Sequence, residues 1–163
     1  CIGCHMPKKN MGLDYALVRY HRIGSPNDKK RVAGDRPLEC ALCHADKSVE
    51  SLASTMEQWY RKRIDRAALK KLYGDDLGTN VMRATLFRGK PHEQAVAMMA
   101  MVGSAVQNPV AVIAPHMAHD YPLVRFFARR ALEQITGTTI DIDVNKSAVE
   151  LRPLIDAWLA AQR

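Results

Sequence analysis

The stretch that decides the fold is Pro122-Leu123-Val124-Arg125-Phe126-Phe127-Ala128-Arg129-Arg130-Ala131-Leu132-Glu133-Gln134-Ile135-Thr136-Gly137. Its apolar residues recur three and four positions apart, which places them on one face of an α-helix. These residues are Val124, Phe127, Ala128, Ala131, Leu132 and Ile135. Arg125, Arg129 and Glu133 fall on the opposite face. The stretch therefore predicts an amphipathic helix that ends at Gly137.

Two segments further upstream extend this pattern. Residues 80–89 match the first part of the stretch loosely, since both contain an apolar residue followed by arginine and a later Phe. Residues 108–115 precede the stretch and are separated from it by a turn around Asp120. The arrangement resembles a HEAT repeat, in which two paired helices stack on neighbouring pairs to form a shared core. About two such units are recognisable.

Helical periodicity covers the rest of the chain after position 47. The predicted helices are 48–64, 65–74, 79–87, 92–106 and 151–159. In the fourth of these, Ala95, Met98, Met99, Val102 and Val106 are expected to face inward as core residues, because methionine fills irregular gaps well. The last helix is amphipathic and is expected to cap the stack.

The first 46 residues differ, because they lack helical periodicity and are rich in glycine and proline. They contain two copies of one pattern, which are Cys1-Ile2-Gly3-Cys4-His5 and Cys40-Ala41-Leu42-Cys43-His44. We therefore expect a mainly α protein with two parts. A loop-rich, haem-wrapped segment at 1–46 precedes a HEAT-like α-helical repeat region at 47–163.

Cys-x-x-Cys-His is the attachment sequence for c-type haem. The two thiols of each copy add to the two vinyl groups of one porphyrin as thioethers. The expected thioether residues are Cys1, Cys4, Cys40 and Cys43, and the adjacent His5 and His44 supply the proximal axial nitrogens to iron. The copies use all four cysteines of the chain, so the sequence predicts two attached haem c groups.

Zinc is the main alternative, since two Cys-x-x-Cys pairs can build a tetrahedral thiolate site. Here 35 residues lie between Cys4 and Cys40, whereas about 15–20 residues separate the pairs in the usual zinc ribbon. A zinc site, a thioredoxin-like redox pair and two structural disulfides all leave the histidine after each pair unexplained. The matched histidines therefore favour haem.

Cys1 stands at the start of the sequence, which leaves no room for an export signal or for residues that pack above a first haem. A mature lipoprotein also begins with cysteine, but lipidation would consume the thiol that haem needs. We expect instead that the sequence is part of a longer protein. Haem is attached outside the cytoplasm in most organisms, so we expect a periplasmic or exported location.

The composition excludes several classes of partner. The chain of 163 residues is 47 % apolar and 25 % charged, as in globular proteins. No apolar stretch approaches the ~20 residues that cross a bilayer, so no transmembrane segment is expected. Four haem propionates would lower the formal charge of +7 to about +3. The scattered cations, with few aromatic residues beside them, argue against nucleic acid and fit propionates or an acidic redox partner better.

Each haem iron needs a sixth ligand unless it binds a substrate. The candidate distal ligands are His21, His92, His116 and His119. His21 lies between the two motifs, His92 begins a predicted helix, and His116 and His119 point to similar sides of one turn. We favour His119 among the last three because it lies at a turn. Each of the four is also compatible with an ordinary surface or helix-end role.

Three segments resemble the closing haem pair of multihaem cytochromes c related to pentahaem nitrite reductase and hydroxylamine oxidoreductase. They are Cys1-Ile2-Gly3-Cys4-His5-Met6-Pro7-Lys8, Tyr20-His21-Arg22-Ile23-Gly24-Ser25-Pro26 and Cys40-Ala41-Leu42-Cys43-His44-Ala45-Asp46. The likeness covers roughly residues 1–50. The remainder resembles helical-repeat extensions found on some members.

The resemblance implies roles for the histidines. It implies that His21 binds a haem attached upstream, and that the haem of the second motif takes its distal histidine from before the first motif. It implies a downstream distal ligand for the first haem, which suits His119, His116 or His92. The catalytic haem of the nitrite reductases has lysine in place of the motif histidine, and this sequence has no such motif.

These observations predict electron transfer by a multihaem c-type cytochrome, acting with other haems or redox proteins, alone or within a larger complex. Whether the chain is also part of an enzyme is left open, although a carrier is favoured over a catalyst. One alternative is a subunit of a multihaem oxidoreductase acting on small nitrogen or sulfur oxyanions. Another is a haem-stabilised helical-repeat scaffold for a redox complex.

Overall fold

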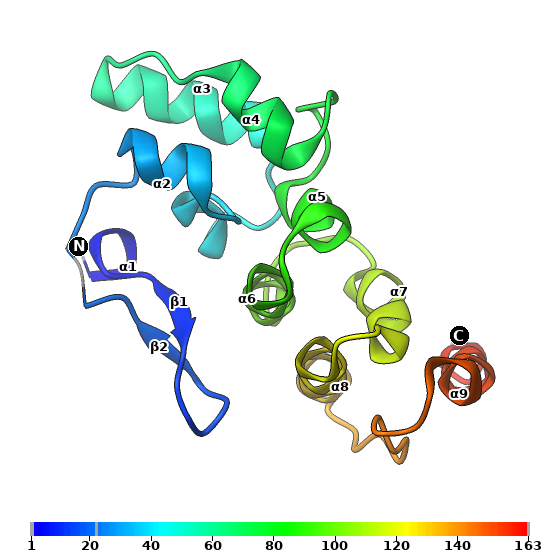
Figure 1. The fold of residues 1–163 in the computed structure, drawn as a ribbon. Coiled ribbons are helices and arrows are strands. Elements are labelled where there is room, and N and C mark those ends of the chain that lie inside the picture. Colours follow the sequence, from blue (N-terminus) through cyan, green and yellow to red (C-terminus); the bar gives the residue numbers. More distant parts are fainter. Residues whose placement is uncertain (1, 22, 163) are drawn as a thin grey trace.

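The structure, a computed structural model, describes residues 2–21 and 23–162. This part of the chain is mainly helical, as the sequence predicted, and carries one small two-stranded sheet. Figure 1 shows the chain running from the N-terminal segment on one side of the molecule to the last helix on the other.

The N-terminal segment is built from short elements. These are α1 (Ile2–His5), β1 (Lys8–Met11), β2 (Leu17–Arg19), α2 (Lys29–Gly34) and the 3₁₀ turn η1 (Glu39–Leu42). The strands pair antiparallel, with Lys8 opposite Arg19 and Met11 opposite Leu17. Tyr15 lies at the tip of this hairpin with a left-handed φ of 57°. The segment therefore contains a hairpin that the sequence did not predict.

Two helices, α3 (Val49–Tyr60) and α4 (Arg66–Tyr73), follow the N-terminal segment. The first was predicted to extend to 64, and it ends earlier because Arg61 turns into the left-handed region at φ 55°. Arg66 links the two helices through ion pairs of 2.8 Å to Glu50 and 2.9 Å to Glu57. The start of α4 is as predicted, because the Asp65 carboxylate accepts hydrogen bonds from two backbone N–H groups of its first turn.

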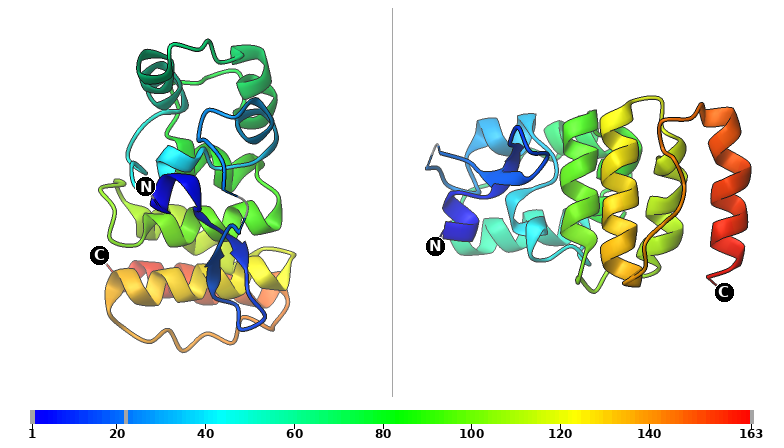
Figure 2. Two further views of the ribbon diagram at one scale, coloured as in Figure 1. Left: turned by 90° about the vertical axis from the view of Figure 1, so that its left-hand side faces the viewer. Right: turned by 90° about the horizontal axis from the view of Figure 1, so that it is seen from below.

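The remaining helices stack side by side. They are α5 (Val81–Arg88), α6 (Pro91–Met101), α7 (Pro109–Ile113), the 3₁₀ turn η2 (Ala114–Ala118), α8 (Pro122–Thr136) and α9 (Ala148–Ala160). Contacts run from α5 to α6, from α6 to α8, from α8 to η2 and from η2 to α9. Figure 2 shows α9 at the end of this stack opposite the N-terminal segment.

Two of these helices differ in how closely they follow the sequence-based prediction. The helix predicted at 122–137 is confirmed as α8, and Gly137 ends it with a left-handed φ of 69°. The helix predicted at 92–106 is shorter, because α6 ends at Met101 and Gly103 adopts a φ of 68°. Residues 93–98 of α6 are buried on all sides, so this helix lies at the centre of the stack.

Buried ion pairs hold the N-terminal segment together, and the one made by Arg36 attaches it to the stack. The Lys9 ammonium pairs with Asp35 at 2.7 Å and donates to the Pro37 carbonyl at 2.8 Å. Arg36 pairs with Glu93 of α6 at 3.0 Å. A continuous cluster of buried apolar residues, from position 32 to position 155, spans both parts of the chain.

Among the described residues, each helix is too short or too polar to reach from one side of a bilayer to the other.

Candidate functional site

The second cysteine motif lines a cavity of about 250 Å³, which we call the motif pocket. Cys40, Cys43 and His44 of the motif all contribute to its wall, and so does Cys4 of the first motif. The opposite wall comes from α3; its residues there are Ser51, Leu52, Thr55, Met56 and Trp59. The structure therefore brings one complete motif and a cysteine of the other to a single, largely apolar cavity.

The 3₁₀ turn η1 explains why the two cysteines of the second motif face the same way. Side chains three residues apart are eclipsed in a 3₁₀-helix, so Cys40 and Cys43 project on one side. The Cys40 carbonyl accepts hydrogen bonds from the N–H groups of Cys43 at 3.3 Å and His44 at 3.0 Å, which fixes the turn. Burial raises the pKa of the Cys40 thiol, with smaller contributions from the neighbouring Cys4 and Glu39.

His5 of the first motif is held in a defined tautomer. Its Nδ1 lies 2.8 Å from the Gly24 carbonyl oxygen, which can only accept, so Nδ1 carries the proton. The Gly24 N–H in turn donates to the His5 carbonyl at 3.2 Å. Nε2 is then left with a free lone pair, which is the form of histidine that binds a metal ion. Cys1 of the same motif lies outside the described residues.

A second cavity, of about 440 Å³, lies beside the first, and we call it the hairpin pocket. The strand hairpin, α6 and α8 supply most of its wall. Gly3 and Cys43 line both pockets, so the two cavities adjoin at the cysteine motifs.

The four candidate distal histidines lie elsewhere. Among the residues described, His21, His92, His116 and His119 contribute to the wall of neither pocket. His21 is exposed after β2, and His92 is exposed at the start of α6. The assignment of each of them as a ligand stays a prediction.

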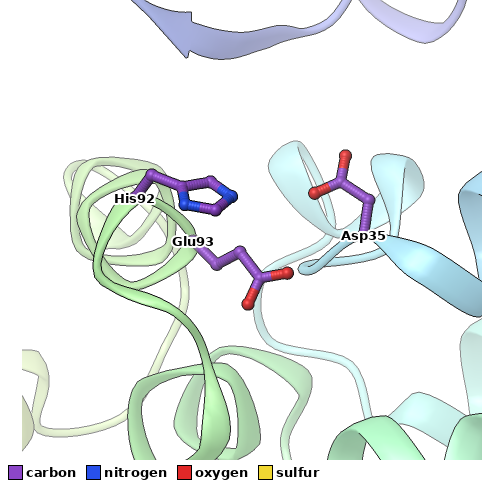
Figure 3. A group of neighbouring side chains, drawn as sticks. All are labelled: Asp35, His92 and Glu93. Carbon is purple, nitrogen blue, oxygen red and sulfur yellow. The ribbon is translucent and has the colours of Figure 1, made fainter.

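His92 does lie within reach of two carboxylates. One ligand atom each of Asp35, His92 and Glu93 lies within 4.8 Å of the others, and Figure 3 shows the three side chains together. Both carboxylates already have cationic partners, since Glu93 pairs with Arg36 and Asp35 pairs with Lys9. The cluster therefore forms part of the buried ion-pair network.

The ligand atoms of the described cysteines and motif histidines lie further apart than those of Asp35, His92 and Glu93. Tetrahedral zinc with thiolates at 2.3 Å needs ligand atoms about 3.7 Å apart. In the described part of the chain, three possible ligand atoms lie within 4.8 Å of one another at Asp35, His92 and Glu93, and not at the cysteines. The cysteines and His44 of the motif pocket thus lie around a cavity, and no three of their ligand atoms are close enough together to bind one metal ion.

His116 and His119 lie together on the far side of α8, with ring centroids 6.3 Å apart. Nδ1 of His119 accepts a hydrogen bond of 3.0 Å from the Tyr121 N–H. Nε2 of His116 is buried and has no hydrogen-bond partner among the described residues. Burial, with a smaller contribution from His119, lowers the pKa of His116 to about 4.

This pKa predicts a pH dependence of stability. The unfolded histidine has a pKa of about 6.5, so between pH 6.5 and about 4 the unfolded chain binds more protons than the folded chain. Stability should fall as the pH falls through this window, by on the order of 2 kcal/mol for a half-buried ring. Urea unfolding at pH 7 and pH 4.5 measures the loss, and His116→Leu should reduce it. His92→Leu, at an exposed site, is the control; equal losses in wild type and His116→Leu would contradict the assignment.

Sequence reasoning missed several residues of this site. A helix was predicted at 48–64, but nothing in the pattern indicated that Met56 and Trp59 of this helix cover the cysteines. The Gly24 carbonyl was missed because a backbone acceptor has no signature in a sequence. Comparison with protein-family models, with curated proteins and with solved structures finds no match to this chain.

Proposed function

We propose that the protein is a c-type cytochrome. More particularly, we propose that it carries two covalently attached haems and transfers electrons as the C-terminal part of a multihaem cytochrome. The observation that carries this proposal is His5, whose Nδ1 is committed to the Gly24 carbonyl and whose Nε2 is therefore free to bind iron. The resemblance of residues 1–50 to multihaem cytochromes supports it as an expectation from sequence.

The residues of the motif pocket fit the proposed cofactor. A porphyrin needs two thiols on one side, an adjacent imidazole and apolar surface against its faces. The eclipsed Cys40 and Cys43 supply the thiols, His44 the imidazole, and Leu52, Met56 and Trp59 of α3 the apolar wall. When bound, haem supplies an iron that gains and loses one electron.

The chain's own residues would then set how that electron moves. Leu52 and Met56 are buried beneath the cavity and keep water from one side of it, which bears on the reduction potential. Trp59 is 68 % exposed and borders the cavity, so it leaves one edge of the site open to a redox partner. Gly3 and Cys43 border both pockets, which favours short distances between two occupants.

We further propose that the stack from α5 to α9 acts as a HEAT-like support. Its helices pack in sequence order as neighbouring pairs, α5 with α6 and η2 with α8, and α9 covers the end. The ion pair between Arg36 and Glu93 attaches the N-terminal segment to this support. A periplasmic or exported location accompanies the proposal, because haem attachment takes place there.

The test is to express the chain in a bacterial periplasm together with the haem-attachment enzymes. We expect the intact mass to exceed that of the polypeptide by two haem groups, and the haems to be reduced and reoxidised reversibly. Paramagnetic resonance then separates the alternatives, because a high-spin signal would favour an oxidoreductase that binds substrate at iron. A protein that gains zinc instead of haem would refute the proposal.

A further inference from the structure

A third hollow lies apart from the cysteine motifs, between α2 and the loop that joins α3 to α4. It has a volume of about 440 Å³, and none of the described cysteines contributes to its wall. Part of the wall is apolar and comes from Val32 and Ala33 of α2, Ile64 of the loop and Ala68 of α4. Because α2 packs against α4 (Figure 1), two helices and a loop form this hollow.

The same wall carries an excess of positive charge. Lys29, Lys62 and Arg63 line the hollow and are exposed to solvent. Within the described part of the chain, the ion pairs are made by other residues. One carboxylate, that of Asp65, also lines the hollow, and it accepts hydrogen bonds from two backbone N–H groups in the first turn of α4. We call this site the basic hollow, and its charge suits a binding surface with several carboxylates.

The loop that carries two of these cations is held at both of its ends. The Arg61 N–H donates to the Glu57 carbonyl at 2.9 Å, and the Ile64 N–H donates to the Glu57 carboxylate at 2.7 Å. The Ile64 carbonyl accepts a hydrogen bond of 3.1 Å from Nη1 of Arg66. The backbone of the loop is therefore ordered before a partner binds, which lowers the entropic cost of binding.

The basic hollow lies close to the exposed edge of the motif pocket. Trp59 borders that pocket and is 68 % exposed, and Tyr60 beside it is 38 % exposed. Arg63 follows Trp59 by four positions, which is at most about 14 Å of extended chain. Tryptophan, tyrosine and arginine are also the residue types that contribute most to binding at protein interfaces. A protein seated on the basic hollow therefore also reaches the edge of the motif pocket.

We infer that the basic hollow is the docking site of an acidic electron-transfer protein, whose carboxylates pair with Lys29, Lys62 and Arg63. A protein is favoured over a membrane surface because a protruding side chain can enter a concave site, whereas a flat bilayer cannot. This inference rests on the proposed function, and it names the class of the redox partner and the place where it binds. In the docked complex one electron passes between the cofactor of the partner and the haem of the motif pocket, and no bond forms or breaks.

The test uses the haem-loaded chain with flavodoxin, a small acidic flavoprotein, as the probe. In stopped-flow experiments at low ionic strength, reduced flavodoxin gives one electron to a ferric haem, and the haem spectrum reports the rate. Lys62→Gln with Arg63→Gln should lower the second-order rate constant by roughly tenfold, because attraction between opposite charges speeds association. The difference from wild type should vanish at about 1 M salt, where the screening length is ~3 Å.

Two controls separate docking from other effects of charge. Lys146→Gln with Arg152→Gln makes the same change of charge at exposed positions in and before α9, at the far end of the stack (Figure 2), and should keep the wild-type rate. Photoreduced lumiflavin, a small uncharged reductant, should reduce wild type and both double variants at one rate. Lys29→Gln changes the opposite side of the hollow and should also slow flavodoxin, so it tests the inference even if the loop variant fails to fold.

The possible results distinguish this inference from the proposed function. Equal flavodoxin rates in the loop variant and the α9 control would overturn the inference and leave the proposed function intact. Binding to phosphatidylglycerol vesicles that the loop variant loses, with no change in its flavodoxin rate, would overturn it in favour of a lipid surface. A chain without attached haem would refute the proposed function instead.

Discussion

Replacing Cys40 and Cys43 together by alanine is expected to remove one of the two haems from the mature chain. The thioethers of the second motif cannot form without these thiols, and the motif pocket loses its attachment points. Intact mass spectrometry counts the haems directly, and we expect a loss of one haem mass. Because α3 then lacks a partner for its apolar wall, we also expect lower thermal stability.

Two comparisons make this result interpretable. The reciprocal variant, Cys1→Ala with Cys4→Ala, should also carry one haem, attached at the second motif. Ser51→Ala changes the pocket wall without touching a thiol and should keep both haems. Two haems in the Cys40→Ala/Cys43→Ala variant would show that the attachment does not use these residues.

Replacing Glu93 by glutamine is expected to destabilise the fold by about 3–5 kcal/mol. The Glu93 side chain is 1 % exposed and that of Arg36 is 9 % exposed, so the variant leaves a buried guanidinium without its counter-charge. The carboxylate also accepts hydrogen bonds from the backbone N–H groups of Arg36 at 3.1 Å and Lys90 at 2.6 Å. Urea unfolding of the variant and the wild type gives the difference directly.

The matched control is Asp46→Asn, which breaks an exposed ion pair with Lys47 at the surface and should change stability little. A double variant, Arg36→Met with Glu93→Leu, removes both charges and should recover much of the loss, because an apolar pair needs no counter-charge. A loss in Glu93→Gln no larger than in Asp46→Asn would show that the buried pair does not hold the N-terminal segment to α6.

The helical part of the fold could be predicted from the sequence because its signals are local. Asp65 begins α4 and Gly137 ends α8 at the positions where caps were expected. The end of α3 could not be predicted, since the left-handed turn at Arg61 is followed by Arg66, whose ion pairs reach back to α3. Such a link depends on how two helices lie in space.

The hairpin was missed for a related reason. Its first strand reads Lys8-Lys9-Asn10-Met11, which lacks the alternation that marks a half-buried strand. Lys9 is 7 % exposed and is buried only because Asp35 and the Pro37 carbonyl receive its ammonium group. Hydropathy does not distinguish a buried lysine from an exposed one, so the sequence did not indicate that residues 8–11 form a strand with a buried position.

The reactive residues of the candidate site could be predicted from the sequence, but the residues that surround them could not. The cysteine motifs identified the thiols, and in the structure Cys4, Cys40 and Cys43 line one cavity. The distal ligands could not be chosen, because four histidines satisfied the same weak criteria. The neighbours of the thiols come from α3, and contacts of this kind follow from packing that no local pattern encodes.

The bond between Arg130 and the Tyr15 carbonyl also bears on the order of events during synthesis. It joins residues 115 positions apart, so the hairpin can dock only after α8 has been made and folded. Chains emerge with the N-terminus first. Both cysteine motifs are therefore made well before the helix that anchors the hairpin beside them. An enzyme that modifies these thiols would therefore find them accessible before the hairpin docks on α8 and less accessible afterwards. The docking of the hairpin would limit the period in which the thiols can be modified.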